Sequence, residues 1–312
     1  MMFQDINTIV KYYETKDLST NLKLLQACQR GEPNLRELSY LTVDEWERPR
    51  EEFTLVKKIG SGNFGEVYEG LWRNTMKVAI KVIKKDITKD DDFQKEVKIM
   101  KQLNHKNILK LYAVSSIDPY YIITELMAKG SLLDFLRGSE GRSLSLPELI
   151  DMAAQVSEGM YYLETSNFVH RDLAARNILL GEHNICKVAD FGLARVIKDE
   201  FYFSHEKIIP YKWTAPEAIS HGYYSVKSDI WSFGVVMYEI VTYGQIPYPG
   251  MSSSEVFSKI TSGYRMPRPQ SCPDVLYQIM LQCWNIDVED RPSFCELRWY
   301  LDSHLNYEDA SL

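Results

Sequence analysis

The feature that most constrains the fold of this chain is a series of short motifs in one fixed order. A glycine-rich run occupies residues 60–67, Val-Ala-Ile-Lys occupies 78–81, and His-Arg-Asp-Leu-Ala-Ala-Arg-Asn occupies 170–177. Asp-Phe-Gly at 190–192 and Ala-Pro-Glu at 215–217 complete the series. One such tripeptide arises by chance in an ordinary loop, whereas the whole ordered series does not. The motifs therefore indicate one domain whose fold brings them to a common site.

The spacing of apolar residues predicts an α+β fold with two lobes. Helical periodicity prevails after Gly130, whereas β-branched runs dominate before it. Strands are expected within 53–85, at 109–114 and at 121–125, and a helix at 91–103. The pattern predicts a small β-rich N-lobe at 53–126 and a larger, mainly helical C-lobe at 127–305. A cleft between such lobes is the natural ligand site.

We expect residues 1–30 to be too few to form a domain of their own. Residues 1–30 have the pattern of one amphipathic helix and a short apolar segment, 31–52 form a polar linker with Trp46, and 306–312 form a short tail. The most apolar run, 230–241, is shorter than the roughly 20 residues that a membrane span needs. We expect it to be a helix buried on all sides.

Composition excludes several classes of protein. The net charge of −7 argues against a nucleic-acid partner, which usually meets a basic face. The five cysteines are scattered without a paired spacing, so neither a disulfide framework nor a zinc site is indicated. The first residues show no signal sequence and no glycine for myristoylation. We therefore expect a cytoplasmic monomer without a covalent membrane anchor.

The glycine-rich run 60–67 alone is a weak signal, because dinucleotide-binding folds use the same letters between a strand and a helix. Here both flanks are strand-like, which favours a hairpin whose backbone closes over phosphates. A plain turn remains the alternative.

Lys81 lies on an expected strand, where its side chain could simply face solvent. Its place 16 residues after Gly65 favours another role, since a cation there can neutralise the phosphates of ATP. Glu96 is the candidate partner, because it lies three residues after Phe93 and four before Met100, on the face expected to point toward the core.

Three polar residues form the expected reaction centre. Asp172 would orient the proton of an attacking hydroxyl, and Asn177 and Asp190 would supply oxygen ligands to Mg²⁺. For Asp172 alone, a helix cap or turn residue is the alternative. From its place before the buried run, Asp229 is expected to be a helix N-cap.

A structural ion pair is also expected outside the reaction centre. Glu217 in Ala-Pro-Glu and Arg291 in Asp-Arg-Pro have the charges for a buried pair that stabilises the lower lobe. Neither is counted among the catalytic residues.

Residues 53–305 resemble the catalytic domain of non-receptor tyrosine kinases related to Src. Leu-Ala-Ala-Arg at 173–176 and Lys-Trp-Thr-Ala-Pro-Glu at 212–217 carry the resemblance. The runs 44–49, 121–127 and 181–184 are similar to the Frk/Srms/Brk branch. The resemblance implies a bilobed kinase fold, ATP with Mg²⁺ or Mn²⁺ as cofactors, and tyrosine-bearing proteins as substrates. The catalytic residues it implies are Lys81, Glu96, Asp172, Arg176 and Asn177, with Asn177 and Asp190 as the metal ligands. It also implies the alternative for Asp229, in which this residue supports the 170–177 loop.

The same resemblance assigns the nucleotide site. Thr124 would be the gatekeeper, Glu125 and Met127 would offer backbone to the adenine, and other residues would enclose the base and phosphates. The implied set is Ile59, Gly60, Ser61, Gly62, Asn63, Phe64, Gly65, Glu66, Val67, Ala79, Lys81, Thr124, Glu125, Met127 and Leu179.

Regulation is implied in the same way. Tyr202 matches an activation-loop autophosphorylation site whose phosphate Arg171 and Arg195 would bind. An unmodified surface tyrosine is the alternative. Residues 3–28 resemble the end of an SH2 domain without its phosphotyrosine-binding arginine, so phosphopeptide docking is not expected.

The resulting hypothesis is a tyrosine kinase that loop phosphorylation at Tyr202 activates. The alternatives are a pseudokinase or inactive fragment that acts as a binding scaffold, and a serine/threonine or dual-specificity kinase. Lys81, Asp172 and Asp190 are all present, whereas loss of any of them would have favoured the pseudokinase.

Overall fold

The computed structural model describes residues 44–62, 65–83, 90–191, 195–196 and 209–309. Residues 46–312 belong to one compact unit, and the description below concerns that unit. The expected SH2 remnant at 1–30 lies outside the described residues. No helix among the described residues is long and apolar enough to cross a membrane.

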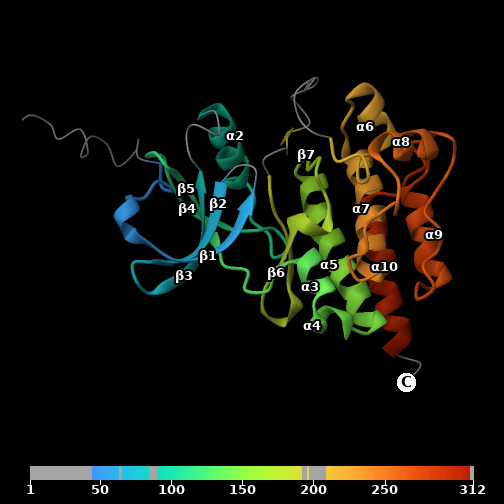
Figure 1. Ribbon diagram of the computed structural model, residues 1–312, viewed down its shortest axis with the longest axis horizontal. Coiled ribbons are helices and arrows are strands. Elements are labelled where there is room, and N and C mark those ends of the chain that lie inside the picture. The colour runs from blue at the N-terminus through green and yellow to red at the C-terminus, as the bar shows by residue number, and fades with distance from the viewer. Residues whose placement is uncertain (1–43, 63–64, 84–89, 192–194, 197–208, 310–312) are drawn as a thin grey trace, which may run out of the picture. The chain divides into compact units, whose positions relative to one another are not determined.

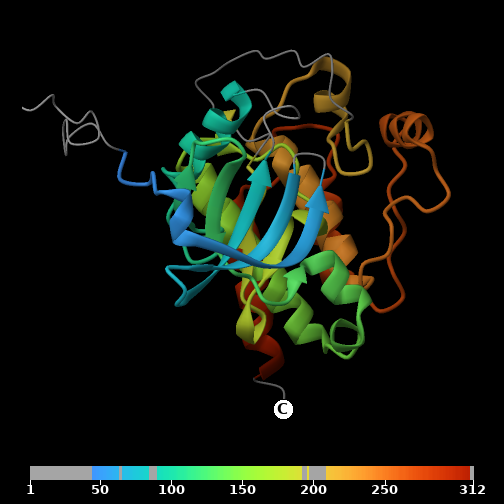
Figure 2. The same cartoon turned by 60° about the vertical axis from the view of Figure 1, so that its left-hand side comes forward.

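The first part of this unit is a five-stranded antiparallel sheet, with one helix against it (Figures 1 and 2). The strand order is β1-β2-β3-β5-β4. Its elements are η1 (Arg50–Glu52), β1 (Phe53–Gly62), β2 (Gly65–Trp72), β3 (Met76–Ile83), α2 (Asp90–Met100), β4 (Leu111–Ser115) and β5 (Tyr120–Glu125). This arrangement confirms the predicted β-rich N-lobe.

The alternation of side chains along β3 determines what each face of the sheet carries. Val78, Ile80 and Val82 pack into an apolar cluster on one face. Because successive side chains of a strand point to opposite faces, Ala79 and Lys81 project from the other face. The buried apolar residues of α2 belong to the second, larger core, and Phe93 of α2 stacks on Tyr120 of β5 with ring centroids 4.5 Å apart.

The second part is mainly helical, as the sequence predicts. Its helices are α3 (Leu132–Arg137), α4 (Ser139–Arg142), α5 (Leu146–Thr165), α6 (Pro216–His221), α7 (Val226–Val241), α8 (Ser253–Thr261), α9 (Asp274–Cys283) and α10 (Phe294–Asp309). Short elements between them are β6 (Gly130–Ser131), β7 (Phe168–Val169), η2 (Ala175–Asn177), β8 (Ile178–Leu180), η3 (Glu182–Asn184), β9 (Cys186–Val188) and β10 (Arg195–Val196). Every residue of α7 from Ser228 to Val241 is buried, which confirms the predicted buried helix.

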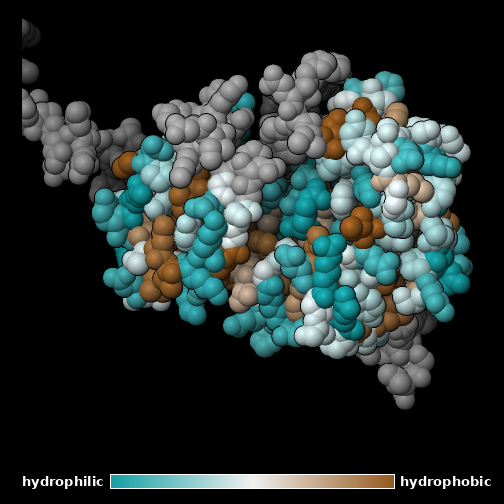
Figure 3. All heavy atoms as spheres, viewed as in Figure 1, coloured by the Kyte–Doolittle hydropathy of each residue, from teal (hydrophilic) through white to brown (hydrophobic). Residues whose placement is uncertain are grey.

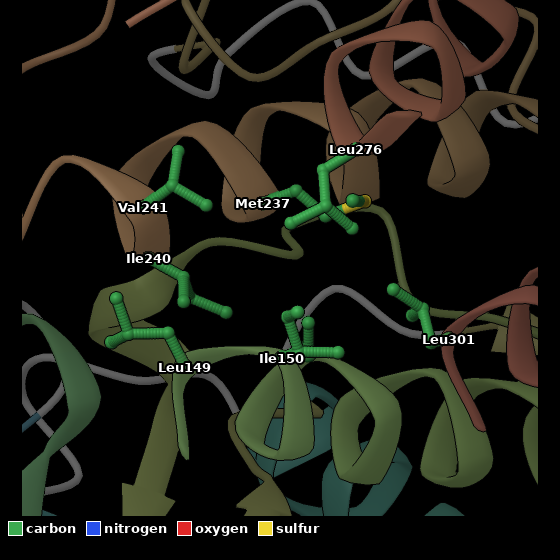
Figure 4. A pocket seen from close by; sticks show the side chains of 8 residues that line it. Leu149, Ile150, Met237, Ile240, Val241, Leu276 and Leu301 are labelled. Carbon is green, nitrogen blue, oxygen red and sulfur yellow. The ribbon is translucent and has the colours of Figure 1, made fainter. Parts of the chain in front are cut away.

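A small apolar cavity lies in the helical core (Figure 4). It lies among helices α5, α7, α9 and α10, and its lining consists of Leu149, Ile150, Ala153, Met237, Ile240, Val241, Leu276 and Leu301. No polar side chain is among them, so the cavity has no group that could orient a polar ligand.

Two further contacts fix the frame of the site. The backbone of Glu47 forms a parallel bridge with Val114, so the linker before β1 extends the sheet at its β4 edge. Helix α6 is held by the expected ion pair, in which Arg291 donates to both carboxylate oxygens of Glu217 at 2.6 and 2.9 Å. The prediction of that pair is confirmed.

Candidate active site

Lys81 of β3 and Glu96 of α2 form an ion pair, with Nζ 2.7 Å from Oε1. Glu96 is buried among the apolar residues of α2, as its spacing predicts. Burial alone would lower the pKa of Lys81, but the nearby carboxylates of Glu96 and Asp190 outweigh it, and the pKa lies above its ordinary value. The ammonium group of Lys81 therefore stays charged and fixed in place.

The hairpin between β1 and β2 requires glycine at residue 65, where β2 begins. Gly65 has a φ of +152°, and a Cβ atom there would lie 2.1 Å from the carbonyl oxygen of Val82. Gly62 and Gly65 pair directly across the hairpin. The predicted residues Asn63 and Phe64 lie outside the described residues. A hairpin of this kind offers backbone groups to a ligand without side-chain bulk.

The residues expected around the base lie on neighbouring strands. Val67 pairs with Gly60 and with Lys81, and Ala79 pairs with Thr124. Thr124 is buried, and its hydroxyl donates to the backbone oxygen of Glu125 at 3.2 Å. The register thus places the predicted gatekeeper beside the strand that carries Lys81.

The remaining members of the predicted nucleotide site come from several elements. Ile59 is exposed on β1, Ser61 and Glu66 pair across the hairpin, and Met127 is buried after β5, whereas Leu179 is half-buried on β8. In Figure 3 the surface is hollowed between the sheet and the helices.

Asp172 lies in the loop between β7 and β8, and neighbours within that loop hold its carboxylate. Nη2 of Arg176 donates to Oδ1, and Nδ2 of Asn177 donates to Oδ2 at 2.8 Å. The same Nδ2 also donates to the backbone oxygen of Asp172 at 2.7 Å. The three predicted catalytic residues of the loop are therefore in direct contact.

Asp229 of α7 supports this loop. Its Oδ2 accepts from the backbone N–H of His170 at 2.7 Å, and its Oδ1 accepts from that of Arg171 at 2.9 Å. The N-cap of α7 is Ser225, which forms a capping box with Ser228. The loop-support alternative for Asp229 is thus confirmed, and the helix-cap alternative is wrong.

The residue before Asp190 is hydrogen-bonded to the loop that carries Asp172. The N–H of Ala189 donates to the backbone oxygen of Asn177 at 2.9 Å, which places the two predicted metal-binding segments side by side. Asp190 has a φ of +62°. Phe191 is buried, and its ring centroid lies 5.6 Å from that of His170. The backbone turn at Asp190 thus sends the next side chain into the core.

The comparisons with known proteins agree with this geometry. A family model described as protein tyrosine and serine/threonine kinase matches residues 53–301. Protein-tyrosine kinase 6 of Homo sapiens is 54% identical over 311 residues, which cover 99% of this chain and 68% of that protein. This chain belongs to the protein tyrosine kinases.

Further relatives place the kinase in one branch of that family. Tyrosine-protein kinase FRK of Homo sapiens is 48% identical over 320 residues, covering 99% of the kinase and 63% of FRK. Tyrosine-protein kinase SRK2 of Spongilla lacustris is 51% identical over 303 residues, covering 96% and 83%. The kinase is a non-receptor, Src-related tyrosine kinase of the Frk/Brk branch, as its sequence predicts.

The donors of the kinase suit a magnesium ion that is shared with a nucleotide. The described residues contain no cluster of three or more histidine, cysteine, aspartate or glutamate side chains that could hold a metal alone. Because Nδ2 of Asn177 is bonded to Asp172, its Oδ1 is the atom able to bind a cation. One amide and one carboxylate oxygen leave room for phosphate oxygens and water, which Mg²⁺ prefers as further ligands.

The predicted regulatory residues are only partly described. Tyr202 lies outside the described residues, and of Arg195 only the backbone is described, paired with Val169. The guanidinium of Arg171 lies 5.3 Å from the ring centroid of Tyr224. The predicted phosphate contacts therefore stay a prediction.

Glu239 is a residue of the site that sequence reasoning missed. Its Oε2 accepts from the backbone N–H of Ala175 at 2.9 Å and from Nε1 of Trp213 at 3.0 Å. Burial raises its pKa, an effect that these hydrogen bonds partly offset. A lone carboxylate inside the otherwise apolar run 230–241 was the available signal, because a buried charge needs partners.

Proposed function

We propose that the kinase transfers the γ-phosphoryl group of ATP to protein tyrosine hydroxyls, with Asp172 orienting the hydroxyl and accepting its proton. The observation that carries this proposal is the carboxylate of Asp172, held by Arg176 on one oxygen and by Asn177 on the other. Phosphoryl transfer depends mainly on positioning and on electrostatic stabilisation, so a fixed carboxylate suits the reaction.

Lys81 would bind the α- and β-phosphates, with Glu96 keeping its side chain in place. Bound Mg²⁺ would neutralise charge on the phosphates, and Asn177 and Asp190 are the residues that would hold it. Thr124, Glu125 and Met127 would face the adenine, and the hairpin around Gly65 would cover the phosphates. The required glycine at that position supports this assignment.

We also propose that phosphorylation of Tyr202 activates the kinase. A phosphate on a loop can order it by pairing with arginine side chains, and Arg171 and Arg195 are the proposed partners. Support comes from Arg171, whose backbone N–H is bonded to Asp229 within the catalytic loop. The loop phosphate and the reaction centre would thus share one rigid support.

We propose a kinase domain at 53–305, an SH2 remnant at 1–30, and a monomer that acts in the cytoplasm. The match over residues 53–301 supports the domain bounds. The buried free thiols of Cys186, Cys272 and Cys283 support a reducing compartment.

A direct test incubates the purified kinase with Mg-ATP and a tyrosine-containing polymer, then analyses the phosphoamino acids. Phosphotyrosine is the expected product, at a rate that Asp172→Asn lowers by a factor of about 10² or more. Predominant phosphoserine on protein substrates would contradict tyrosine specificity. Absence of transfer with ATP still bound would favour the pseudokinase alternative.

A further inference from the structure

Two buried carboxylates of α7 hold the catalytic loop on both sides of Asp172. Asp229, in the first turn of the helix, accepts from the backbone of 170–171. Glu239, near the last turn, accepts from the backbone N–H of Ala175. Ten residues of helix correspond to about 15 Å along its axis. One rigid helix therefore fixes both ends of the segment that presents Asp172.

Glu239 also fixes a residue of the Lys-Trp-Thr-Ala-Pro-Glu segment. The same Oε2 that binds Ala175 accepts from the indole N–H of Trp213. Ser232 of α7 donates to the backbone oxygen of Trp213 at 2.8 Å. Trp213 is therefore tied to α7 through both its side chain and its backbone.

The indole of Trp213 in turn supports Arg176. The guanidinium carbon of Arg176 lies 4.6 Å from the ring centroid, within the range of a cation–π contact. Arg176 also pairs with Asp172, and its positive charge acts on the carboxylate of Glu239. Arg176 thus connects the ring of Trp213 to the carboxylate of Asp172.

We infer that Glu239 is a positioning residue for phosphoryl transfer. It holds the indole of Trp213, which supports Arg176, and Arg176 in turn orients the carboxylate of Asp172. The inference rests on the proposed role of Asp172. Loss of the charge on Glu239 would weaken its hydrogen bonds to Trp213 and Ala175, because an ionised acceptor bonds more strongly than a neutral one. The indole under Arg176 would then be held less firmly, and so would the contact of Arg176 with Asp172. The expected consequence is slower transfer with unchanged nucleotide binding.

Glu239→Gln tests the role of the charge. A glutamine oxygen can still accept from Ala175 and Trp213, so the variant removes the charge and keeps both acceptor contacts. Thr242→Val is the matched control, because the buried Thr242 lies just after α7 and its hydroxyl donates to the backbone oxygens of Tyr238 and Glu239 within its own turn. Steady-state kinetics with a tyrosine peptide and thermal unfolding are measured for both.

For Glu239→Gln we expect kcat to fall about tenfold or more, with the KM for ATP within about twofold of wild type. Thr242→Val should keep the wild-type kcat. A wild-type kcat in Glu239→Gln, or an equal loss in Thr242→Val, would overturn the inference.

Trp213→Phe gives a second measurement, which also serves if Glu239→Gln unfolds early. It removes the indole N–H and keeps an aromatic ring under Arg176. Its kcat should fall, and the double variant should be no slower than the slower single variant, because both changes interrupt one connection. Full additivity would contradict the inference.

Asp172→Asn separates this inference from the proposed function. An active Asp172→Asn variant would overturn the role of Asp172 itself. An inactive Asp172→Asn beside a fully active Glu239→Gln would overturn only the positioning role of Glu239.

Discussion

Arg291 and Glu217 form a bidentate ion pair in which the arginine side chain is fully buried. The two residues lie 74 positions apart, so the pair ties the start of α6 to the segment before α10. The guanidinium also donates to the backbone oxygens of Asn285 and Lys227 at 2.9 Å. All three guanidinium nitrogens of Arg291 therefore donate to an acceptor.

Arg291→Ala should destabilise the kinase strongly. Removing one partner of a buried pair leaves the other charge uncompensated, which costs about 3–5 kcal/mol. Arg298→Ala is the control, because the pair of Arg298 with Glu158 is more exposed and should contribute about 0–1 kcal/mol. Urea unfolding measures both, and equal losses would contradict the account of the buried pair.

Gly65→Ala should lower the free energy of unfolding. The new Cβ would meet the carbonyl oxygen of Val82 at 2.1 Å, in a backbone conformation that alanine rarely adopts, at a cost of about 1–3 kcal/mol. Gly60→Ala is the matched change, since its Cβ would have an ordinary 3.7 Å contact with Val67. Calorimetry compares the two, and a Gly65→Ala variant as stable as Gly60→Ala would show that the hairpin is wrongly described.

Glu96→Gln tests the electrostatic environment of Lys81. The pKa of Lys81 is raised in the folded kinase. Its ion pair with Glu96 therefore contributes its full stabilisation at pH values below the unfolded-state pKa of about 10.4. That contribution is lost as the pH rises through the folded pKa. The difference in unfolding free energy between wild type and Glu96→Gln should therefore be constant from pH 8 to pH 10 and shrink above it. A difference that grows at alkaline pH would contradict the assignment.

Thiol labelling tests the buried core. Burial raises the pKa of the thiols of Cys186 and Cys283, and raises that of Cys272 to about 11, whereas Cys295 is exposed. Because the thiolate is the reactive form, iodoacetamide at pH 8 should label Cys295 far faster than the other three. Peptide mass spectrometry follows the labelling. Rapid reaction of Cys283 in the folded kinase would contradict its placement.

Local patterns in the sequence predicted much of the site. Glu96 could be assigned because its spacing from Phe93 and Met100 defines the inner face of a helix. The same reasoning placed the end of that helix too late, at residue 103 in place of Met100. Leu103 is buried, but its N–H donates to the backbone oxygen of Met100 in a turn, so apolar spacing continued beyond the helix.

Contacts between distant segments account for the rest. The strand predicted from residue 109 begins at Leu111, because Leu109 donates to Val188 of β9 and not to the sheet. Glu239 was missed because its partner Ala175 lies 64 residues away. The lone carboxylate in the run 230–241 indicates that a partner is needed, but the local sequence does not identify Val188 or Ala175 as the partners in these contacts.

The most direct test of the proposed reaction is peptide mass spectrometry of wild type and Asp172→Asn after incubation with Mg-ATP. The account predicts phosphate on tyrosine, including Tyr202, in the wild type and none in the variant, while both still bind ATP. Equal phosphorylation of the two proteins, or ATP binding without phosphate in either, would contradict it.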